Sequence, residues 1–280
     1  MSDIYFINGQ FLKLEDARIS INDRGFQFGD GVYEVIRSYN GKVFHLEEHL
    51  KRFEKSASEI ELPLPVSLNE IQRWIQEAFS RSQYPMAKIY IQMTRGLAER
   101  SHPFPVKIQP TFLITVLELH PLSPVLTQRG VEIITTEDLR WGRCDIKSLN
   151  LLPNVLAQQK AKKAGVYEAL MIRNQRVTEG SISNFFMIKN DTLITAPLSH
   201  FILPGVTRDL VLSLARSLTF KVLERDIFVQ ELYQADEAFI SGTTIEIVPV
   251  VKVDGKQIGN GIPAGMTQTL IKEFQALTLA

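Results

Sequence analysis

The chain has 280 residues, of which 31 are basic, 31 are acidic and 45% are hydrophobic, so it can bury one large core or two ordinary ones. Its zero net charge lacks the basic footprint of a protein that binds nucleic acid or an anionic membrane. Small molecules or a second copy of the chain are therefore the expected partners. The single cysteine, Cys144, excludes an internal disulfide, and the N-terminus has no signal-peptide pattern. We expect a cytoplasmic protein that does not cross a membrane.

The first half of the chain mixes strands with two helices. Apolar residues recur at helical spacing over 45–60 and 68–82, with Leu50 and Phe53 on one face of the first helix. Residues 23–31 read as a glycine-punctuated loop that lacks the lysine ending of a nucleotide P-loop. The strands predicted from alternation and turn signals are 4–7, 10–14, 32–39, 42–44, 87–94 and 111–118.

Two prolines interrupt both periodicities between His120 and Pro124, which indicates an interdomain linker. The second half then alternates strands and helices. Strands are predicted over 131–136, 167–172, 183–189, 192–195, 236–241 and 245–253, and helices over 151–164, 207–218 and 266–277. This order predicts a mixed α/β fold with a small N-terminal domain over 1–119, a linker over 120–130 and a larger C-terminal domain over 131–280.

Lys147 is the first candidate for catalysis. A lysine amine becomes a nucleophile towards carbonyls only when its pKa is lowered by burial or by neighbouring cations. Lys147 follows the apolar Ile146, and Arg140 and Arg143 precede it, so we expect a lowered pKa. Such a lysine could hold pyridoxal phosphate as a Schiff base. The alternative is that Lys147 is an ordinary solvated charge on the surface.

Three further motifs could bind such a cofactor. Glu179 stands alone between a turn and a strand of small and apolar residues, where its carboxylate could face the pyridine nitrogen; alternatively it is a surface glutamate. Pro204-Gly205 precedes a helix whose free N–H groups could bind phosphate, unless Thr207 caps that helix as in an ordinary turn. The turn over 241–244 offers backbone and hydroxyl donors, or simply joins two strands.

Two patterns point to other chemistry. His45 and His49 match the inverted zinc-peptidase spacing, and on a helix they would share one face, so a metallopeptidase is one alternative. Cys144 could be a nucleophile, although a lone cysteine is more often a buried packing residue. A catalytically silent binding protein is a further alternative. Residues 95–105 form a turn-rich segment that carries two arginines, a histidine and an aromatic residue, as ligand-binding loops often do.

Five motifs follow one another in a fixed order over nearly the whole chain. They are Phe28-Gly29-Asp30-Gly31-Val32-Tyr33-Glu34, Lys147-Ser148-Leu149-Asn150, Val177-Thr178-Glu179-Gly180-Ser181, Leu203-Pro204-Gly205-Val206-Thr207-Arg208 and Gly242-Thr243-Thr244-Ile245-Glu246-Ile247. This order resembles the class IV, or fold-type IV, pyridoxal phosphate aminotransferases. Within that class, Thr94-Arg95-Gly96, Arg100-Ser101-His102 and residues 143–150 resemble the bacterial D-amino acid enzymes, whereas Pro204 resembles the branched-chain enzymes.

The resemblance implies a fold-type IV fold, pyridoxal 5'-phosphate as the cofactor, and a C-terminal domain that binds it. Lys147 would be the Schiff-base lysine and the proton carrier. The other implied cofactor-binding residues are Glu179 at the pyridine nitrogen and Arg52, Val206, Thr207 and Thr243 at the phosphate. The implied site for the substrate carboxylate consists of Tyr33, Arg100 and His102. Dimers of the family place the arginine and histidine of this loop in the neighbouring subunit's site, so the resemblance also implies a homodimer.

The reaction that the resemblance implies is transamination of D-amino acids, with D-alanine and 2-oxoglutarate giving pyruvate and D-glutamate. An arginine recognises a carboxylate through two parallel hydrogen bonds. Moving that arginine to the other side of the pocket would reverse the enantiomer accepted, so Arg100 and His102 are expected to set D-specificity. The alternatives within the same fold are a branched-chain L-amino acid aminotransferase and an aminodeoxychorismate lyase. No metal is expected.

Overall fold

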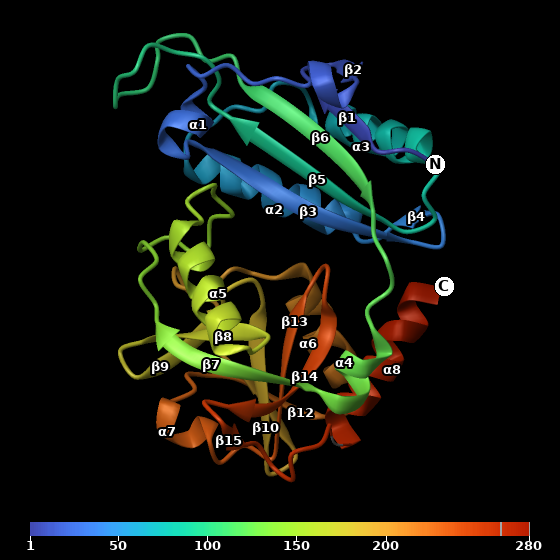
Figure 1. The fold of residues 1–280 in the computed structure, drawn as a ribbon, viewed down its shortest axis with the longest axis vertical. Helices are drawn as coiled ribbons and strands as arrows, with labels where there is room; N and C mark the ends of the chain where they lie inside the picture. The colour runs from blue at the N-terminus through green and yellow to red at the C-terminus, as the bar shows by residue number, and fades with distance from the viewer. Residues whose placement is uncertain (264, 280) are drawn as a thin grey trace. The chain divides into compact units, whose positions relative to one another are not determined.

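Two β-sheets organise the chain in the computed structural model, which describes residues 1–263 and 265–279 (Figure 1). The contacts between residues divide it into two units. Unit 1 comprises Met1–Pro121 together with Ile146–Asn150, and unit 2 comprises Leu122–Asp145 and the chain from Leu151 onward. The short segment that carries Lys147 therefore folds with the N-terminal part of the chain.

Unit 1 is built on a six-stranded sheet in which every neighbouring pair of strands is antiparallel, in the order β2-β1-β6-β5-β3-β4. Two long helices, α2 and α3, pack on this sheet. The strands are β1 (Ile4–Ile7), β2 (Gln10–Leu12), β3 (Gly31–Tyr39), β4 (Lys42–Val43), β5 (Ala87–Thr94) and β6 (Thr111–Glu118). The helices are η1 (Leu14–Asp16, a 3₁₀ turn), α1 (Arg24–Phe28), α2 (Leu46–Glu59) and α3 (Leu68–Ser82).

The period-2 pattern of the strands explains why these helices cover one face of the sheet. Along β5, Ala87, Ile89 and Ile91 are fully buried, while Lys88 and Tyr90 between them are partly exposed. The buried side chains belong to one apolar cluster that also includes residues of α2 and α3. Because neighbouring side chains on a strand point to opposite faces, the apolar set faces the helices.

The segment Ile146–Asn150 docks along β3 by backbone pairing. Ile146 is buried in the apolar cluster of unit 1. The amide of Tyr33 donates to the carbonyl of Lys147 at 3.0 Å, and the amide of Leu149 donates to the carbonyl of Gly31, also at 3.0 Å. The chain therefore holds Lys147 at the start of β3 through backbone bonds that are independent of its side chain.

Unit 2 is built on a nine-stranded mixed sheet. The strand order is β12-β11-β10-β13-β14-β7-β8-β9, and β15 pairs with β14. Three pairs are parallel, namely β11 with β12, β14 with β7 and β7 with β8. The strands are β7 (Val131–Glu137), β8 (Glu168–Arg173), β9 (Arg176–Gly180), β10 (Asn184–Lys189), β11 (Thr192–Thr195), β12 (Lys221–Glu224), β13 (Glu237–Gly242), β14 (Glu246–Val253) and β15 (Lys256–Gln257).

Five helices accompany this sheet, and two of them pack against each other. Helix α5 packs on β8 through small residues such as Ala157 and Ala161. Helices α6 and α8 contact each other and β13. The bounds are α4 (Pro124–Arg129), α5 (Leu152–Ala164), α6 (Val206–Ser217), α7 (Val229–Leu232) and α8 (Gly265–Leu279). Among the described residues, no helix combines the length and the apolar character needed to span a bilayer.

The secondary structure confirms the predicted helices and strands to within two residues at each end. The prediction of a loop over 23–31 was wrong, because residues 24–28 form helix α1, whose first turn is fixed by Asp23 as N-cap. The sequence analysis also missed β9, β12, α7 and β15, and it placed α4 within the expected linker. These elements are short, and a pattern of two to six residues carries too little periodicity to be recognised.

The carboxylate of Asp23 is fully buried and ties α1 to the ends of two strands. It accepts hydrogen bonds from the amide of Gly25 at 2.8 Å and from the hydroxyls of Thr94 at 3.0 Å and Thr111 at 2.7 Å. Replacing Asp23 with alanine leaves these three buried donors without their acceptor. We expect the substitution to lower the free energy of unfolding by about 3 kcal/mol.

Urea unfolding of the two proteins measures this loss, and Ser67→Ala is the matched control. Ser67 caps α3 at an exposed position and accepts only from the amide of Glu70 at 3.3 Å. An ordinary exposed cap is worth about 1 kcal/mol. Equal losses from the two substitutions would show that the buried network of Asp23 adds nothing to its cap.

Candidate active site

Lys147 lies against an aromatic ring in unit 1. Its Nζ lies 4.3 Å from the centre of the Tyr33 ring, and its amide donates to the Ser56 hydroxyl at 3.1 Å. Both Lys147 and Tyr33 are partly exposed. The electron-rich face of a ring attracts an ammonium group, so Tyr33 helps to orient the end of a flexible side chain. The backbone bonds and the ring together hold the amine that the sequence analysis singled out.

A buried ion cluster stands in the same unit. Arg52 donates through Nε and Nη2 to the two carboxylate oxygens of Glu34, at 2.7 and 2.8 Å, and Nδ1 of His49 lies 2.8 Å from the same carboxylate. Burial opposes ionisation of Glu34, but Arg52 and His49 outweigh it and lower its pKa to about 2. Burial lowers the pKa of His49, and the charges of Arg52 and Lys147 lower it further, against the pull of Glu34. Arg52, expected at the phosphate, is thus oriented by a carboxylate.

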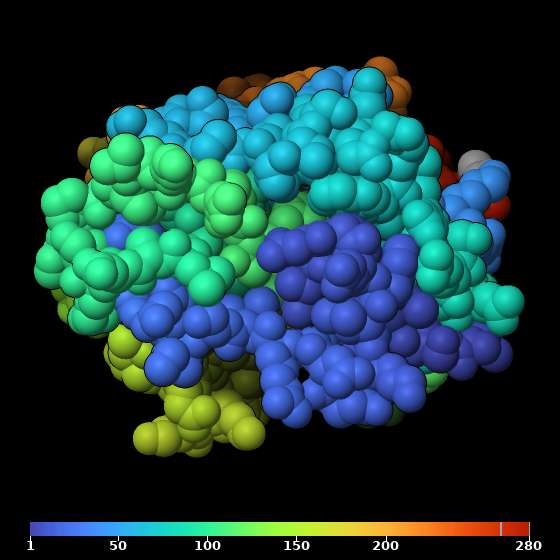
Figure 2. Space-filling model, turned by 90° about the horizontal axis from the view of Figure 1, so that it is seen from above, coloured from blue at the N-terminus to red at the C-terminus, as the bar shows by residue number. Residues whose placement is uncertain are grey.

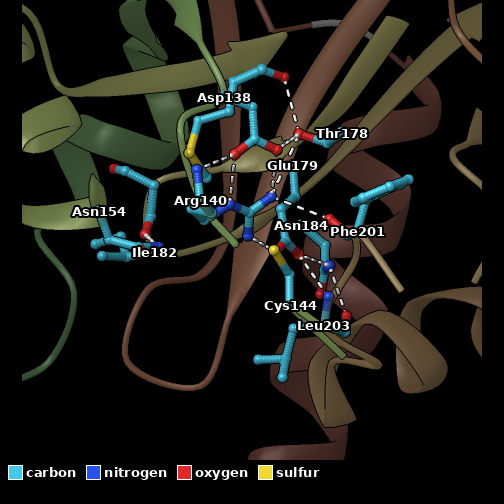
Figure 3. A network of polar contacts seen from close by, with 12 residues as sticks. Asp138, Arg140, Cys144, Asn154, Thr178, Glu179, Ile182, Asn184, Phe201 and Leu203 are labelled. Atoms are coloured by element: carbon cyan, nitrogen blue, oxygen red, sulfur yellow. Dashed lines mark hydrogen bonds and ion pairs between the residues drawn. The ribbon is translucent and has the colours of Figure 1, made fainter. Parts of the chain in front are cut away.

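Glu179 is the centre of a second buried network, in unit 2 (Figure 3). It forms an ion pair with Arg140 and accepts from Nδ2 of Asn184 at 2.9 Å and from the amide of Leu203 at 3.0 Å. Burial raises the pKa of Glu179, Arg140 opposes that rise, and Asp138 adds to it. The carboxylate is therefore fixed in position and is more basic than a solvated glutamate.

Arg140 is shared between two carboxylates. Its Nε and Nη2 donate to Asp138 at 2.9 Å, and its Nη2 also donates to the carbonyl of Phe201 at 3.0 Å (Figure 3). Burial would raise the pKa of Asp138, but hydrogen bonds and charge from Arg140 lower it to about 2. The sequence analysis missed this role of Arg140, because the partner Glu179 lies 39 residues further along the chain.

A buried glutamate supports the turn that joins β9, which carries Glu179, to β10, which begins at Asn184. Glu168 accepts from the amide of Ile182 at 2.8 Å and from the hydroxyls of Ser183 at 3.0 Å and Ser181 at 3.2 Å. The side chain of Ile182 itself points outward and is 59% exposed. No pattern around Glu168 in the sequence indicated that it holds this turn.

The approach to α6 has the features of an anion site. Gly205 is the N-cap, and since it has no side chain, no side-chain bond caps the helix. A Cβ at this position would lie 2.0 Å from Oδ1 of Asn184, so only glycine fits. Val206 and Thr207 form the first turn, whose amides and dipole favour a bound phosphate. The alternative in which Thr207 caps the helix is wrong, because Thr207 lies inside α6.

A polar atom without a partner lies beside these groups. The Ser241 hydroxyl is buried and has no hydrogen-bond partner among the described residues. Ser241 is paired in register with Asn184, which donates to Glu179. Thr243 follows two residues later and is partly exposed. A polar ligand would satisfy the Ser241 hydroxyl, so the donors of this region fit a phosphorylated, nitrogen-containing cofactor.

Arg100 and His102 lie on the loop between β5 and β6, in unit 1. Both are exposed, and both contact Phe28: the Arg100 guanidinium lies 4.7 Å from the ring centre, and the two rings of Phe28 and His102 are 5.5 Å apart. Phe28 closes helix α1, three residues before β3 begins. The structure therefore brings these two residues together on one ring, as it brings Lys147 and Tyr33 together.

Three expectations at this stage need correction or refinement. Arg140 and Arg143, expected to lower the pKa of Lys147, are each paired with carboxylates of their own, since Arg143 donates to Asp145 at 3.0 Å. The spacing of His45 and His49 does not put both on one helical face, because His45 is the N-cap of α2 with φ of 50°. Burial raises the pKa of the Cys144 thiol to about 11, which makes it a packing residue and not a nucleophile.

Among residues 1–263 and 265–279, no group of three histidine, cysteine or carboxylate side chains is placed to hold a metal ion. His49 is engaged with Glu34, and His45 pairs with Glu48. The geometry on which the metallopeptidase alternative rested is thus not present.

Comparison with known proteins places this geometry in a family. The model of the family described as amino-transferase class IV matches residues 31–253. The chain belongs to the class IV aminotransferases. This aminotransferase is 41% identical over 270 residues to the D-alanine aminotransferase of Staphylococcus aureus (strain N315), a match that covers 96% of each chain. It is 42% identical over 269 residues to that of Bacillus licheniformis, covering 96% of this chain and 94% of the relative.

Solved structures give the same fold. The branched-chain amino acid aminotransferase of Escherichia coli superposes with a TM-score of 0.94 at 27% identity, covering 99% of this chain and 95% of the other. A branched-chain enzyme from T.th., solved with pyridoxamine 5'-phosphate, superposes with a TM-score of 0.93 at 27% identity, covering 98% and 93%. The fold-type IV assignment is confirmed. As a class IV aminotransferase, the chain uses pyridoxal 5'-phosphate, which the donor set of unit 2 fits.

The buried Glu168 gives this aminotransferase a pH dependence. Burial raises its pKa to about 7, although the turn donates three hydrogen bonds to it. A carboxyl group whose pKa is higher in the folded than in the unfolded state stabilises the fold when protonated. This contribution is fully present below pH 4.5 and is lost as the pH rises through about 7. It amounts to about 3 kcal/mol.

Glu168→Gln should remove this dependence while keeping the shape of the side chain. The difference in unfolding free energy between the two proteins should therefore change between pH 4.5 and 8, by urea unfolding at each pH. Glu34 and Asp138, whose pKa values are about 2, affect both proteins equally and cancel in the difference. The exposed Glu77→Gln is the control. A difference that is constant with pH would contradict the raised pKa.

Proposed function

We propose that this aminotransferase transfers the amino group of D-amino acids, with D-alanine and 2-oxoglutarate giving pyruvate and D-glutamate. The observation that carries the proposal is the 41–42% identity, over almost the whole length, to relatives named D-alanine aminotransferase. The loop that bears Arg100 and His102 supplies chemistry suited to a substrate carboxylate. Amino acids and 2-oxo acids are its substrates.

Lys147 is the residue that we assign to catalysis. When bound, pyridoxal phosphate supplies a carbonyl that links to amines and a ring that accepts electrons. The Nζ of Lys147 would hold that carbonyl at rest, remove the α-proton of the substrate and return a proton at the end. Tyr33, 4.3 Å away by its ring centre, would keep the amine directed between these tasks.

Glu179 would hold the pyridine nitrogen in its protonated form. A carboxylate does so best when it is fixed and basic, and Glu179 has three donors and a raised pKa. The residues assigned to the phosphate are Arg52, Val206, Thr207 and Thr243. Their donors are a guanidinium oriented by Glu34, two amides of an uncapped helix end and a turn threonine.

Tyr33, Arg100 and His102 would bind the substrate carboxylate. The exposure of Arg100 and His102 on a projecting loop supports a site completed by a second copy of the chain, and so a homodimer in which each loop serves the partner's site. An arginine and an imidazole fix the side from which the carboxylate is held. Because Lys147 acts from a fixed place, that choice of side selects the D-enantiomer.

The competing assignment is a branched-chain L-amino acid aminotransferase, favoured by the solved structures with the same fold. Purified enzyme with pyridoxal phosphate, 2-oxoglutarate and either D-alanine or L-leucine separates the two. The proposal expects pyruvate and glutamate from D-alanine, with the glutamate in the D-form by chiral chromatography. Transfer from L-leucine with formation of L-glutamate, and none from D-alanine, would replace the proposal by its competitor.

Arg100→Ala tests the carboxylate site. Loss of a charge-assisted contact to a carboxylate should raise KM for D-alanine about 30-fold and leave the bound-cofactor spectrum unchanged. Steady-state kinetics and a visible spectrum measure the two quantities. Arg73→Ala is the control, because Arg73 is an exposed arginine on α3 that pairs only locally with Glu70. A KM equal to that of the unsubstituted enzyme would refute the role of Arg100.

A further inference from the structure

The loop between β5 and β6 lacks a sheet or helix of its own, yet it carries two residues that must be placed accurately. It runs from Arg95 to Pro110, and most of its side chains are exposed; Val106 is fully so. Figure 2 shows its green surface spread open beside the helices of unit 1. A loop of this length would sample many conformations unless its backbone is tied down. The question is which group ties it.

Arg24 reaches the loop from helix α1. Its Nη1 donates to the carbonyl of Ser101 at 2.5 Å and lies 3.4 Å from that of Pro103, while its Nη2 donates to the carbonyl of His102 at 3.2 Å. The side chain is only 4% exposed. Three consecutive carbonyls therefore converge on one guanidinium, directly after Arg100.

The guanidinium is itself fixed from the other side. Its Nε donates to Asp30 at 2.8 Å, and the same carboxylate accepts from Arg95, at the base of the loop, at 2.9 Å. The Arg24 amide donates to the carbonyl of Gly96 at 2.9 Å. Asp23, the buried N-cap, holds the first turn of α1. The arginine thus transmits the position of a rigid element to the middle of the loop.

The side chains of the loop meet the same helix. Phe28, one turn after Arg24, has the Arg24 guanidinium 4.8 Å from its ring centre, the Arg100 guanidinium 4.7 Å away and the His102 ring 5.5 Å away. Helix α1 therefore holds the backbone of the loop through Arg24 and the two side chains of interest through Phe28. A planar group with five donors can serve a carboxylate and several carbonyls at once, which an ammonium group cannot.

We propose that Arg24 is a positioning residue for substrate recognition: by holding the carbonyls of residues 101–103 it sets the place of Arg100 and His102, and so the affinity for the substrate carboxylate. The inference rests on the proposed function of those two residues. Arg24 does not touch the substrate in this account. It acts on binding and leaves the chemical step at Lys147 alone.

The test uses the holoenzyme with Arg24→Gln and Arg24→Lys. For Arg24→Gln we expect KM for D-alanine to rise about tenfold with kcat within about twofold, because carboxylate binding is weakened and chemistry is not. Arg24→Lys, which keeps the charge beside Asp30, should raise KM by only about threefold. Hydrogen exchange of the amides over 97–107 should become about tenfold faster in Arg24→Gln, while the bound-cofactor spectrum is unchanged.

Arg81→Gln is the matched control. Arg81 also pairs with a carboxylate, that of Glu77 on α3, and lies over a phenylalanine ring, that of Phe11, 3.9 Å from its centre. It has no contact with the loop among its hydrogen bonds, so neither KM nor exchange over 97–107 should change.

The outcomes separate the inference from the function on which it rests. If Arg100→Ala raises KM but Arg24→Gln changes neither KM nor exchange, the positioning role is wrong and the proposed function stands. If neither substitution changes KM, the carboxylate assignment itself is wrong and the inference falls with it. Should Arg24→Gln not fold, Arg24→Lys decides, and an unchanged KM together with unchanged exchange in that variant overturns the proposal.

Discussion

Each unit depends on a buried carboxylate that an arginine makes tolerable. A carboxylate removed from water is costly unless a cation and hydrogen-bond donors replace the solvent, and removal of one partner of a buried pair typically costs about 3–5 kcal/mol. Glu34 with Arg52 in unit 1 and Glu179 with Arg140 in unit 2 meet this requirement. Both arginines are therefore structural as well as electrostatic, and the groups assigned to the cofactor inherit their positions.

The two pairs differ in a way that suits different tasks. Arg52 serves Glu34 with two parallel hydrogen bonds, and the pKa of Glu34 falls to about 2, so this glutamate remains an anion that orients its arginine. Arg140 is divided between Asp138 and Glu179, and the pKa of Glu179 is raised. A fixed carboxylate of raised basicity is the better acceptor for a protonated ring nitrogen, the role proposed for Glu179.

The sequence predicts much of this and misses what depends on distant partners. Lys147 and Gly205 stand in short motifs with recognisable local chemistry, and long helices show their period, so these are found by inspection. Arg24 and Glu168 are not, because their roles come from strand register and loop packing between residues tens of positions apart. Arg140 shows the same limit: its position near Lys147 in the chain suggested one partner, and the fold gives it another.

The most direct test of the account is the visible absorption of the purified enzyme, loaded with pyridoxal phosphate, before and after D-alanine is added, with L-alanine in a parallel sample. The account predicts a band that is lost in the Lys147→Ala protein and that only D-alanine bleaches in the unsubstituted one. A band that L-alanine bleaches and D-alanine does not would contradict the assignment of Arg100 and His102. An unsubstituted protein that acquires no band would contradict the cofactor site as a whole.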